Sequence, residues 1–166
     1  AIGQSDNVFT PLQIASYISM VANGGTRYQA HVVKKVTNYA RTETVVADIE
    51  DNPTVLGTAD ISAENFEIVH QGMRRAITGG SVSSTLGNYP IPLAGKTGTA
   101  TTGSGSAHGV FACYAPYDDP EIAVVVVLEH GAHGYSGAYA AKQILDCYFG
   151  INTGGGDVTE GDATAE

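Results

Sequence analysis

The chain has 166 residues, of which 43% are hydrophobic and only 15% are charged. This length corresponds to one domain or part of one, and it is long enough to bury a substantial core. The formal net charge is −9, and the 8 basic residues are scattered singly or in pairs. Because phosphate neutralisation needs a clustered basic face, the composition argues against nucleic acid as a partner.

The longest purely apolar run, Ile122 to Leu128, has seven residues and is too short for a membrane span. No signal peptide is recognisable at Ala1, so an exported or anchored parent would carry its targeting segment upstream of this chain. The two cysteines, Cys113 and Cys147, lack the spacing of a metal site. We expect both to be buried free thiols rather than a disulfide.

The first predicted helix has Thr10 as its N-cap and Pro11 at its first position. Helical spacing predicts a buried face made by Leu12, Ala15, Ile18 and Ala22. The Asn-Gly-Gly sequence at residues 23–25 ends this helix. Two strand-like stretches follow, and we expect them to form a polar surface hairpin: His31–Tyr39 and Thr42–Ile49.

A second helix is predicted after the N-cap Ser62, with Ile61 and Phe66 at the spacing of a hydrophobic staple. Its expected buried face comprises Phe66, Val69, Met73 and Ile77. Its expected solvated face comprises Glu64, Glu67, Arg74 and Arg75. The glycines at residues 79–80 end the helix, and a turn-rich stretch then leads to Leu93–Ala100.

Two further strands are predicted, Gly109–Tyr114 and Ile122–Glu129, joined by a turn. The continuous run Val124–Leu128 predicts a central strand covered on both faces. A last helix is expected at about Tyr135–Phe149, and its buried face would comprise Ala138, Ala141, Leu145 and Tyr148. Short connections between strands favour an antiparallel sheet with helices packed on it, so the predicted fold class is α+β.

The sharpest local signal is the sequence Lys96-Thr97-Gly98-Thr99, which stands where a strand is expected. Thr97 and Thr99 alternate with Gly98 and share one face, whereas Lys96 points to the other face unless its stem bends over the strand edge. A glycine inside a strand often marks a close approach by a ligand. These residues offer a cation, two hydroxyls and backbone N–H groups, which suit a carboxylate and a developing oxyanion.

The surrounding segments include Ala-Ile-Gly-Gln at residues 1–4, Phe-Thr-Pro-Leu-Gln at 9–13, Ala-Asn-Gly-Gly at 22–25 and Asp-Asp-Pro-Glu-Ile-Ala at 118–123. In this order, and with Ala94 to Ala100, they resemble the C-terminal part of the transpeptidase domain of class B penicillin-binding proteins. Lys-Thr-Gly is the third signature of that class, after Ser-x-x-Lys and Ser-x-Asn. The resemblance implies that residues 1–150 are the C-terminal half of such a domain. Residues 151–166 are Gly-rich and acidic, and we expect a disordered tail there.

The resemblance further implies a peptidoglycan D,D-transpeptidase, a serine acyltransferase that acts on D-Ala-D-Ala stem peptides and is inhibited by β-lactams. Lys96 would assist proton transfer, and Gly98 would let the substrate backbone approach. Thr97 and Thr99 would bind the donor carboxylate, and the N–H of Thr99 would form half of an oxyanion hole. No metal or organic cofactor is implied. The parent would act on the extracytoplasmic face of the bacterial cell membrane, anchored by an upstream segment.

The nucleophile of this family is not found in the 166 residues. The residues three positions before the four lysines are His31, Val32, Leu93 and Tyr139, so no Ser-x-x-Lys is present. Without that serine no acyl-enzyme forms, and the chain would need the N-terminal half of its own domain as a partner. Ser5-Asp6-Asn7 matches the second signature in letters only. It lies beside a helix start, where these residues are ordinary caps.

Other interpretations of the sequence are weaker. Gly95-Lys96-Thr97 imitates the end of a Walker A loop, but Pro90 stands where that motif requires glycine. His130 and His133 lie near Glu129 without a third metal ligand at helical spacing, so we expect an exposed loop near the site's rim. His108 begins a strand and is a candidate for lining the site.

A different class of function also fits the resemblance. The chain would then be a non-catalytic penicillin-recognition or sensor module built on the same fold. A Ser-x-x-Lys upstream of Ala1, together with activity on a peptide donor, would distinguish the enzyme from the sensor.

Overall fold

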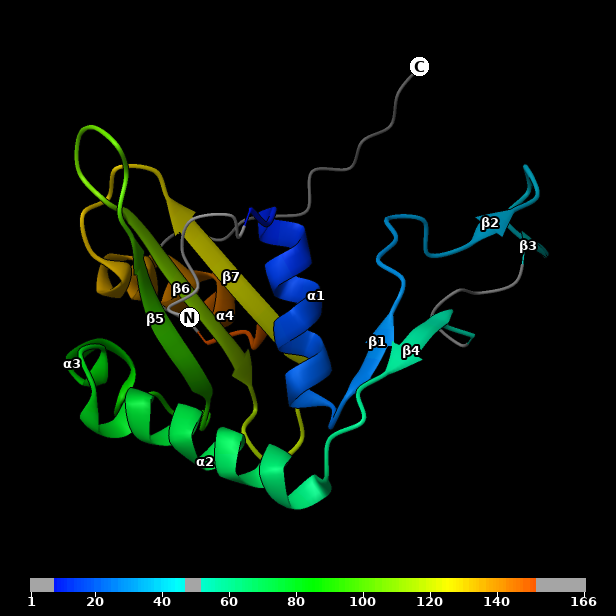
Figure 1. The fold of residues 1–166 in the computed structure, drawn as a ribbon. Helices are drawn as coiled ribbons and strands as arrows, with labels where there is room; N and C mark the ends of the chain where they lie inside the picture. Colours follow the sequence, from blue (N-terminus) through cyan, green and yellow to red (C-terminus); the bar gives the residue numbers. More distant parts are fainter. Residues whose placement is uncertain (1–7, 47–51, 152–166) are drawn as a thin grey trace.

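The structure, a computed structural model, describes residues 8–46 and 52–151. Helices and antiparallel strands both contribute, which confirms the predicted α+β class (Figure 1). The elements in chain order are α1 (Pro11–Ala22), β1 (Thr26–Tyr28), β2 (Val36–Thr37), β3 (Thr44–Val46), β4 (Val55–Thr58), α2 (Ala63–Gly79), α3 (Ser83–Leu86), β5 (Ala94–Ala100), β6 (His108–Ala115), β7 (Ile122–Leu128), η1 (Gly134–Ser136) and α4 (Gly137–Tyr148).

The main sheet has the strand order β5-β6-β7, and both pairs are antiparallel. The expectation that Val124–Leu128 is a central strand is therefore wrong for the described residues, because β6 is central and β7 lies at an edge. Only Val124 in this run is buried, and Val127 is 38% exposed. A run of β-branched residues indicates a strand, but it does not say how many strands pair with it.

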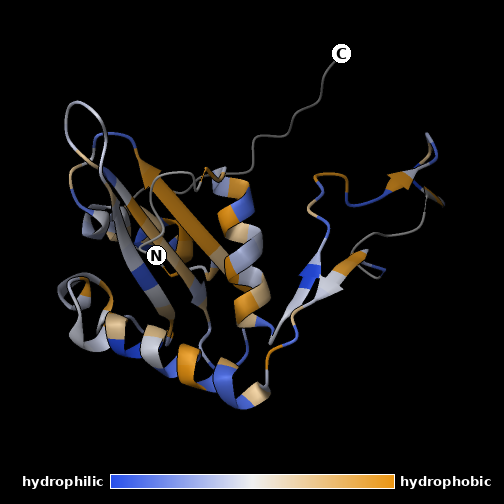
Figure 2. Ribbon diagram, in the orientation of Figure 1, coloured by the Kyte–Doolittle hydropathy of each residue, from blue (hydrophilic) through white to orange (hydrophobic). Residues whose placement is uncertain are grey.

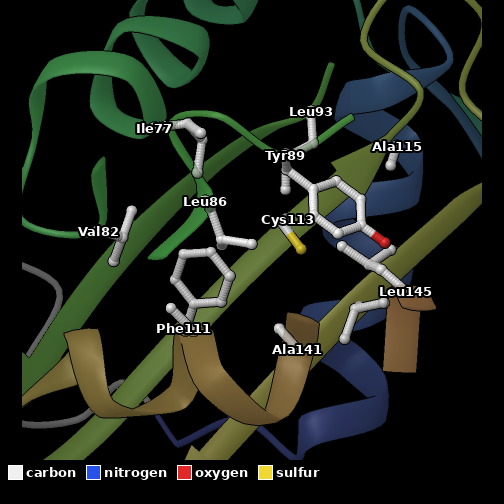
Figure 3. Packing of buried hydrophobic residues seen from close by; sticks show 12 residues of the cluster. Ile77, Val82, Leu86, Tyr89, Leu93, Phe111, Cys113, Ala115, Ala141 and Leu145 are labelled. Carbon is white, nitrogen blue, oxygen red and sulfur yellow. The ribbon is translucent and has the colours of Figure 1, made fainter. Parts of the chain in front are cut away.

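Helices cover both faces of this sheet. On one face α4 packs against β6 and β7, and Figure 3 shows Ala141 and Leu145 close to Phe111 and Cys113. On the other face α1 packs against the same strands (Figure 1), with Ile18 in a second cluster. The members of that second cluster are Ile18, Ala22, Ala94, Ala112 and Tyr114.

The helix boundaries follow the capping residues closely. The Thr10 hydroxyl accepts a bond from the Gln13 N–H at 3.2 Å, and the Gln13 side chain accepts one from the Thr10 N–H at 2.8 Å, forming a capping box. Ser62 caps α2 with its side chain alone, accepting from the Asn65 N–H at 3.3 Å. The C-caps are Asn23 and Gly80, at the predicted ends.

The predicted buried faces are right in part. Most of the expected residues are buried or half-buried, but Leu12, Val69 and Tyr148 are exposed. Periodicity identifies a face but not its width, and these three side chains lie on parts of α1, α2 and α4 that no described element covers. Both cysteines are free, as predicted. Cys113 is buried, whereas Cys147 is exposed, which corrects the expectation for that residue.

Residues 26–46 and 52–58 form an arm beside the sheet (Figure 1). At its base β1 pairs with β4, and further out β2 pairs with β3. The outer pair confirms a hairpin, but its first strand is far shorter than predicted, since irregular backbone occupies much of residues 31–43. The inner pair and the short helix α3 were not predicted, because elements of three or four residues carry little periodic signal.

No helix within residues 8–46 and 52–151 is long and apolar enough to cross a bilayer. Three parts of the predictions lie outside the described residues: Ser5-Asp6-Asn7, residues 47–49 of the hairpin and residues 152–166 of the tail. Ile151 packs against the cluster under α4.

Candidate active site

Strand β5 carries the Lys-Thr-Gly sequence at an edge of the described sheet, where only β6 pairs with it. Lys96, Gly98 and Thr99 are exposed, and Thr97 is half-buried. An edge strand directs alternate backbone N–H and C=O groups away from its sheet. The candidate residues are therefore accessible to an extended ligand lying along this edge.

The pairing register assigns the side chains of β5 to the two faces of the sheet. Thr97 lies opposite Phe111, whose ring belongs to the cluster under α4, and Lys96 lies opposite Ala112 on the face covered by α1. The lysine thus points away from the threonine side, as alternation predicts. The Lys96 ammonium donates to the Thr97 carbonyl at 2.9 Å, so its stem folds along the strand.

The glycines around β5 serve different purposes. A Cβ at Gly95 would lie 2.7 Å from the Ala112 carbonyl oxygen, and one at Gly134 would overlap the Gly98 carbonyl oxygen. These two glycines are required because backbone packs directly on backbone. A Cβ at Gly98 would meet only Val110, at 3.6 Å, which is ordinary contact. The chain's own packing therefore does not demand glycine at position 98, which is compatible with a ligand passing there.

Two side chains of α2 hold the neighbouring elements in place. Arg74 is half-buried and donates to the Leu93 carbonyl at 2.9 Å, directly before β5. The His70 Nε2 donates to the Val21 carbonyl near the end of α1 at 2.7 Å. Placing Arg74 on the solvated face was wrong, because its long side chain reaches around the helix. The sequence does not predict either hydrogen bond, since both depend on how α2 crosses the sheet.

At the far end of β5 two loops meet, one between β5 and β6 and the other after β7. The His130 backbone N–H donates to the Nδ1 of His108 at 3.0 Å, and the centroids of the two imidazole rings are 4.9 Å apart. His130 and His133 are exposed, as expected for a rim loop, and His133 stacks on Tyr135. In the part of the chain that the structure describes, no three metal-ligating side chains come together.

Several titratable groups lie inside the fold rather than at this edge. Burial raises the pKa of the Cys113 thiol to about 12. Burial is also the largest cause that raises the pKa of Tyr89, followed by the carboxylate of Asp146. Asp146 itself is buried and receives a 2.7 Å ion pair from Lys142. Tyr89 and Cys113 belong to the cluster under α4, and the Lys142–Asp146 pair lies within that helix.

A hollow of about 590 Å³ lies on the outer side of α1. Its lining is mainly apolar, with Arg27 at one side, and it includes Phe9, Ile14, Tyr17 and Met20. None of residues 96–99 lines it. The hollow and the β5 edge are therefore separate features.

Taken together, an α+β fold presents one cation, two hydroxyls and an open backbone edge on one strand. That combination is chemically suited to an extended peptide bearing a carboxylate. Residues 1–147 match the penicillin binding protein transpeptidase domain. The chain belongs to this family, and the resemblance to its class B members is confirmed.

Named relatives agree with this assignment. Penicillin-binding protein 2A of Bacillus subtilis is 32% identical over 169 residues, covering 92% of this chain and 24% of that protein. The peptidoglycan D,D-transpeptidase MrdA of Acinetobacter baumannii is 32% identical over 165 residues, covering 88% of this chain and 23% of that protein. The chain thus spans about a quarter of the length of these relatives.

A solved structure shares the fold. Penicillin-binding protein A from M. tuberculosis, in its imipenem acyl-enzyme complex, superposes with a TM-score of 0.69 at 25% sequence identity. The superposition covers 86% of this chain and 32% of that one.

Proposed function

We propose that this chain is the C-terminal half of the catalytic domain of a peptidoglycan D,D-transpeptidase and supplies the Lys-Thr-Gly edge of its active site. The observation that carries the proposal is strand β5, an edge strand with Lys96, Gly98 and Thr99 exposed, in a chain of this family. Support for acyl transfer comes from the relative named a D,D-transpeptidase and from the acyl-enzyme of the mycobacterial protein.

In this proposal a serine from outside the 166 residues attacks the amide carbonyl between the last two D-Ala residues of a stem peptide. The serine proton passes to a neighbouring base, and the carbonyl oxygen becomes an oxyanion that accepts a bond from the Thr99 N–H. The C–N bond then breaks, the terminal D-Ala leaves as a protonated amine, and an ester remains on the serine. An amine of a second stem peptide takes the acyl group and releases the serine, which forms the cross-link.

The side chains of β5 would hold the donor peptide during these steps. The hydroxyls of Thr97 and Thr99 would donate to its terminal carboxylate, and the β5 edge would pair with its extended backbone. The carboxylate of a β-lactam would occupy the same place. Lys96, now folded along β5 with its ammonium on the Thr97 carbonyl, would turn towards the serine hydroxyl of the second signature and assist proton transfer.

Two apolar surfaces of this chain support the idea that another part of the same domain packs on it. The hollow on α1 is lined by Phe9 and Tyr17, which are exposed, and Leu12 beside them is exposed as well. Contiguous exposed apolar residues mark interaction sites. Strand β7 is apolar but lies at an edge of the described sheet. We propose that the N-terminal half of the same domain covers α1 and adds a strand beside β7.

The location and partners follow from the same assignment. The substrates would be peptidoglycan stem peptides on the extracytoplasmic face of the bacterial cell membrane, and β-lactams would be inhibitors. An upstream segment would provide the membrane anchor. The mechanism needs no metal or organic cofactor, because the serine and its lysine bases carry the proton transfers.

A fluorescent penicillin followed by a denaturing gel and intact mass tests the proposal. The 166-residue chain should carry no covalent adduct, since no serine here has a lysine three residues later. Adding the upstream segment, in the same chain or as a separate one, should produce a stoichiometric adduct. In that assembly Lys96→Ala should slow acylation about 10²-fold or more, the usual contribution of acid–base catalysis.

The matched control is Lys35→Ala, because Lys35 is an exposed lysine on the arm. It should leave the acylation rate unchanged. An adduct on Ser5 of the isolated chain would overturn the proposal. An assembly that forms adducts but transfers no acyl group to an amine would instead identify the penicillin-recognition module.

A further inference from the structure

The two loops beside β5 are joined by three hydrogen bonds. The His130 N–H donates to the Nδ1 of His108 at 3.0 Å, and the Ala132 N–H donates to the Ala107 carbonyl at 2.9 Å. The third joins the Nδ1 of His130 and the Ser106 carbonyl at 2.9 Å. In Figure 1 these are the loop between β5 and β6 and the loop after β7. The contact begins next to the site strand, because His108 pairs with Ala100 at the end of β5.

The two histidines respond to a proton in opposite ways. A carbonyl oxygen only accepts, so the Nδ1 of His130 must carry a hydrogen, and it keeps that hydrogen in both the neutral and the protonated ring. The Nδ1 of His108 accepts a hydrogen bond from a backbone N–H, so this nitrogen carries no hydrogen. Protonation places a second hydrogen between the two nitrogens and breaks this bond. The contact therefore exists only while His108 is neutral.

The loop after β7 has a backbone that depends on such contacts. His130 has a φ of 52° and Ala132 a φ of 62°, which is the left-handed region that non-glycine residues seldom adopt. This conformation persists only where surrounding interactions hold it. The N–H groups of these same two residues donate to His108 and Ala107. Losing the His108 bond therefore removes one of the contacts that hold the loop in place.

We propose that neutral His108 is a positioning residue that fastens the loop after β7 to the loop between β5 and β6, and that protonation of His108 releases both loops from the end of β5. The fastened loops hold the end of the strand that carries Thr97 and Thr99. That consequence for a substrate rests on the proposed function, whereas the contact between the loops does not.

The charged and titratable groups around His108 come from three elements. The loop after β7 provides Glu129, His130 and His133, and Tyr135 of η1 stacks on His133. Strand β5 provides Lys96, but it lies four positions before Ala100, the partner of His108, and its ammonium is bonded to the Thr97 carbonyl. The His130 ring is the nearest of these groups, with its centroid 4.9 Å from that of His108.

The test is amide hydrogen exchange of the 166-residue chain by NMR at several pH values, expressed as protection factors that remove the intrinsic pH dependence. At neutral pH the N–H groups of His130 and Ala132 should be protected. Their protection should fall roughly two- to tenfold on acidification, the factor that one hydrogen bond contributes. Amides of β6 serve as the internal reference for the intact fold, and the Thr97 and Thr99 amide shifts report the position of β5.

Two variants separate positioning from structure. His108→Asn keeps an oxygen acceptor where Nδ1 stood but does not titrate, so the loops should stay protected and the shifts of β5 should stay constant across the pH range. His108→Leu fills similar space without an acceptor, so protection should be low at every pH while β6 stays protected. An acid-induced loss that persists in H108N, or unchanged loop protection in H108L, would overturn the proposal. Neither result depends on acylation. A failure of the proposed function can therefore be distinguished from a failure of the loop contact.

Discussion

The three-stranded sheet and the arm contain the same kinds of β-branched and aromatic residues but bury them very differently. In the sheet, Phe111 and Val124 are buried because α4 covers their face. In the arm, Val32, Tyr39 and Val45 are exposed, and Figure 2 shows hydrophobic segments there with no helix over them. The comparison teaches that the covering elements, rather than residue type, decide where apolar residues stabilise this fold.

The largest expected effect comes from Gly134→Ala in the sheet-and-helix body. A Cβ at this position would overlap the Gly98 carbonyl oxygen and lie 2.6 Å from the carbonyl oxygen of Val110. Both atoms are backbone and cannot move aside, so the free energy of unfolding should fall by about 3 kcal/mol. Urea unfolding followed by circular dichroism measures this change.

Gly103→Ala is the matched control for that substitution. A Cβ at Gly103 would meet no atom within 4 Å, and its free energy of unfolding should change by less than about 0.5 kcal/mol. Equal losses for the two variants would contradict the close backbone packing of η1 on β5.

A pair of valine substitutions compares the body and the arm directly. Val124 is 5% exposed and Val45 is 66% exposed, and both lie in strands. Val124→Ala should cost about 2 kcal/mol, since it removes two buried methyl groups and leaves a cavity. Val45→Ala should cost less than about 0.5 kcal/mol. A large loss at Val45 in the same urea measurement would show that the arm has a packed core of its own.

Much of this architecture could be predicted from local signals. Capping residues such as Thr10 and Ser62 fix helix starts, because each satisfies backbone N–H groups in its own turn. The short turn after β5 required an antiparallel neighbour, and the register of β5 and β6 confirms it. The resemblance around Lys96 identified the family. The caps and the turn act over a few residues, whereas the resemblance rests on several segments in a fixed order.

Features set by distant partners could not be predicted. Nothing in the sequence of α2 shows that Arg74 meets the Leu93 carbonyl, nineteen positions away. The contact between His108 and His130 joins residues 22 positions apart and depends on the sheet register. The placement of β7 at an edge likewise depends on which strands lie beside it. Whether a residue is charged or apolar does not determine these contacts or the position of β7 in the sheet.

The two cysteines extend the comparison to chemical reactivity. Cys113 is buried in the sheet and its pKa is raised to about 12, whereas Cys147 is exposed on α4. At pH 8 iodoacetamide should modify one thiol in the native chain and two in urea, as counted by intact mass. Because only the thiolate reacts, Cys113 stays inert until unfolding. Cys147→Ser should show no native adduct, and two native adducts on the unmodified chain would contradict the burial of Cys113.

The raised pKa also predicts an alkaline limit to stability. The native thiol of Cys113 keeps its proton to about pH 12, whereas an unfolded thiol loses it near about pH 8.5. The stabilisation is therefore complete below about pH 8.5 and declines as the pH rises from there towards 12. Cys113→Ala should flatten this alkaline decline in urea midpoints, after allowance for the cavity that it leaves.

The smallest effect is expected from removing the outer arm. Replacing residues 30–53 with Asn-Gly would close the chain where the Gln29 N–H donates to the Thr54 carbonyl at 2.9 Å. Asn-Gly suits a two-residue hairpin turn, so the pairing of β1 with β4 should survive. The residues removed include Val32, Tyr39 and Val45, which are exposed, and a shorter connection costs less entropy to close. The melting temperature should therefore shift by less than about 4 °C, which corresponds to less than about 1 kcal/mol. Differential scanning calorimetry measures the shift, and amide exchange of β6 shows whether the body is intact. A loss of 10 °C or more would mean that the arm stabilises the body, and the contrast between the two regions would then fail.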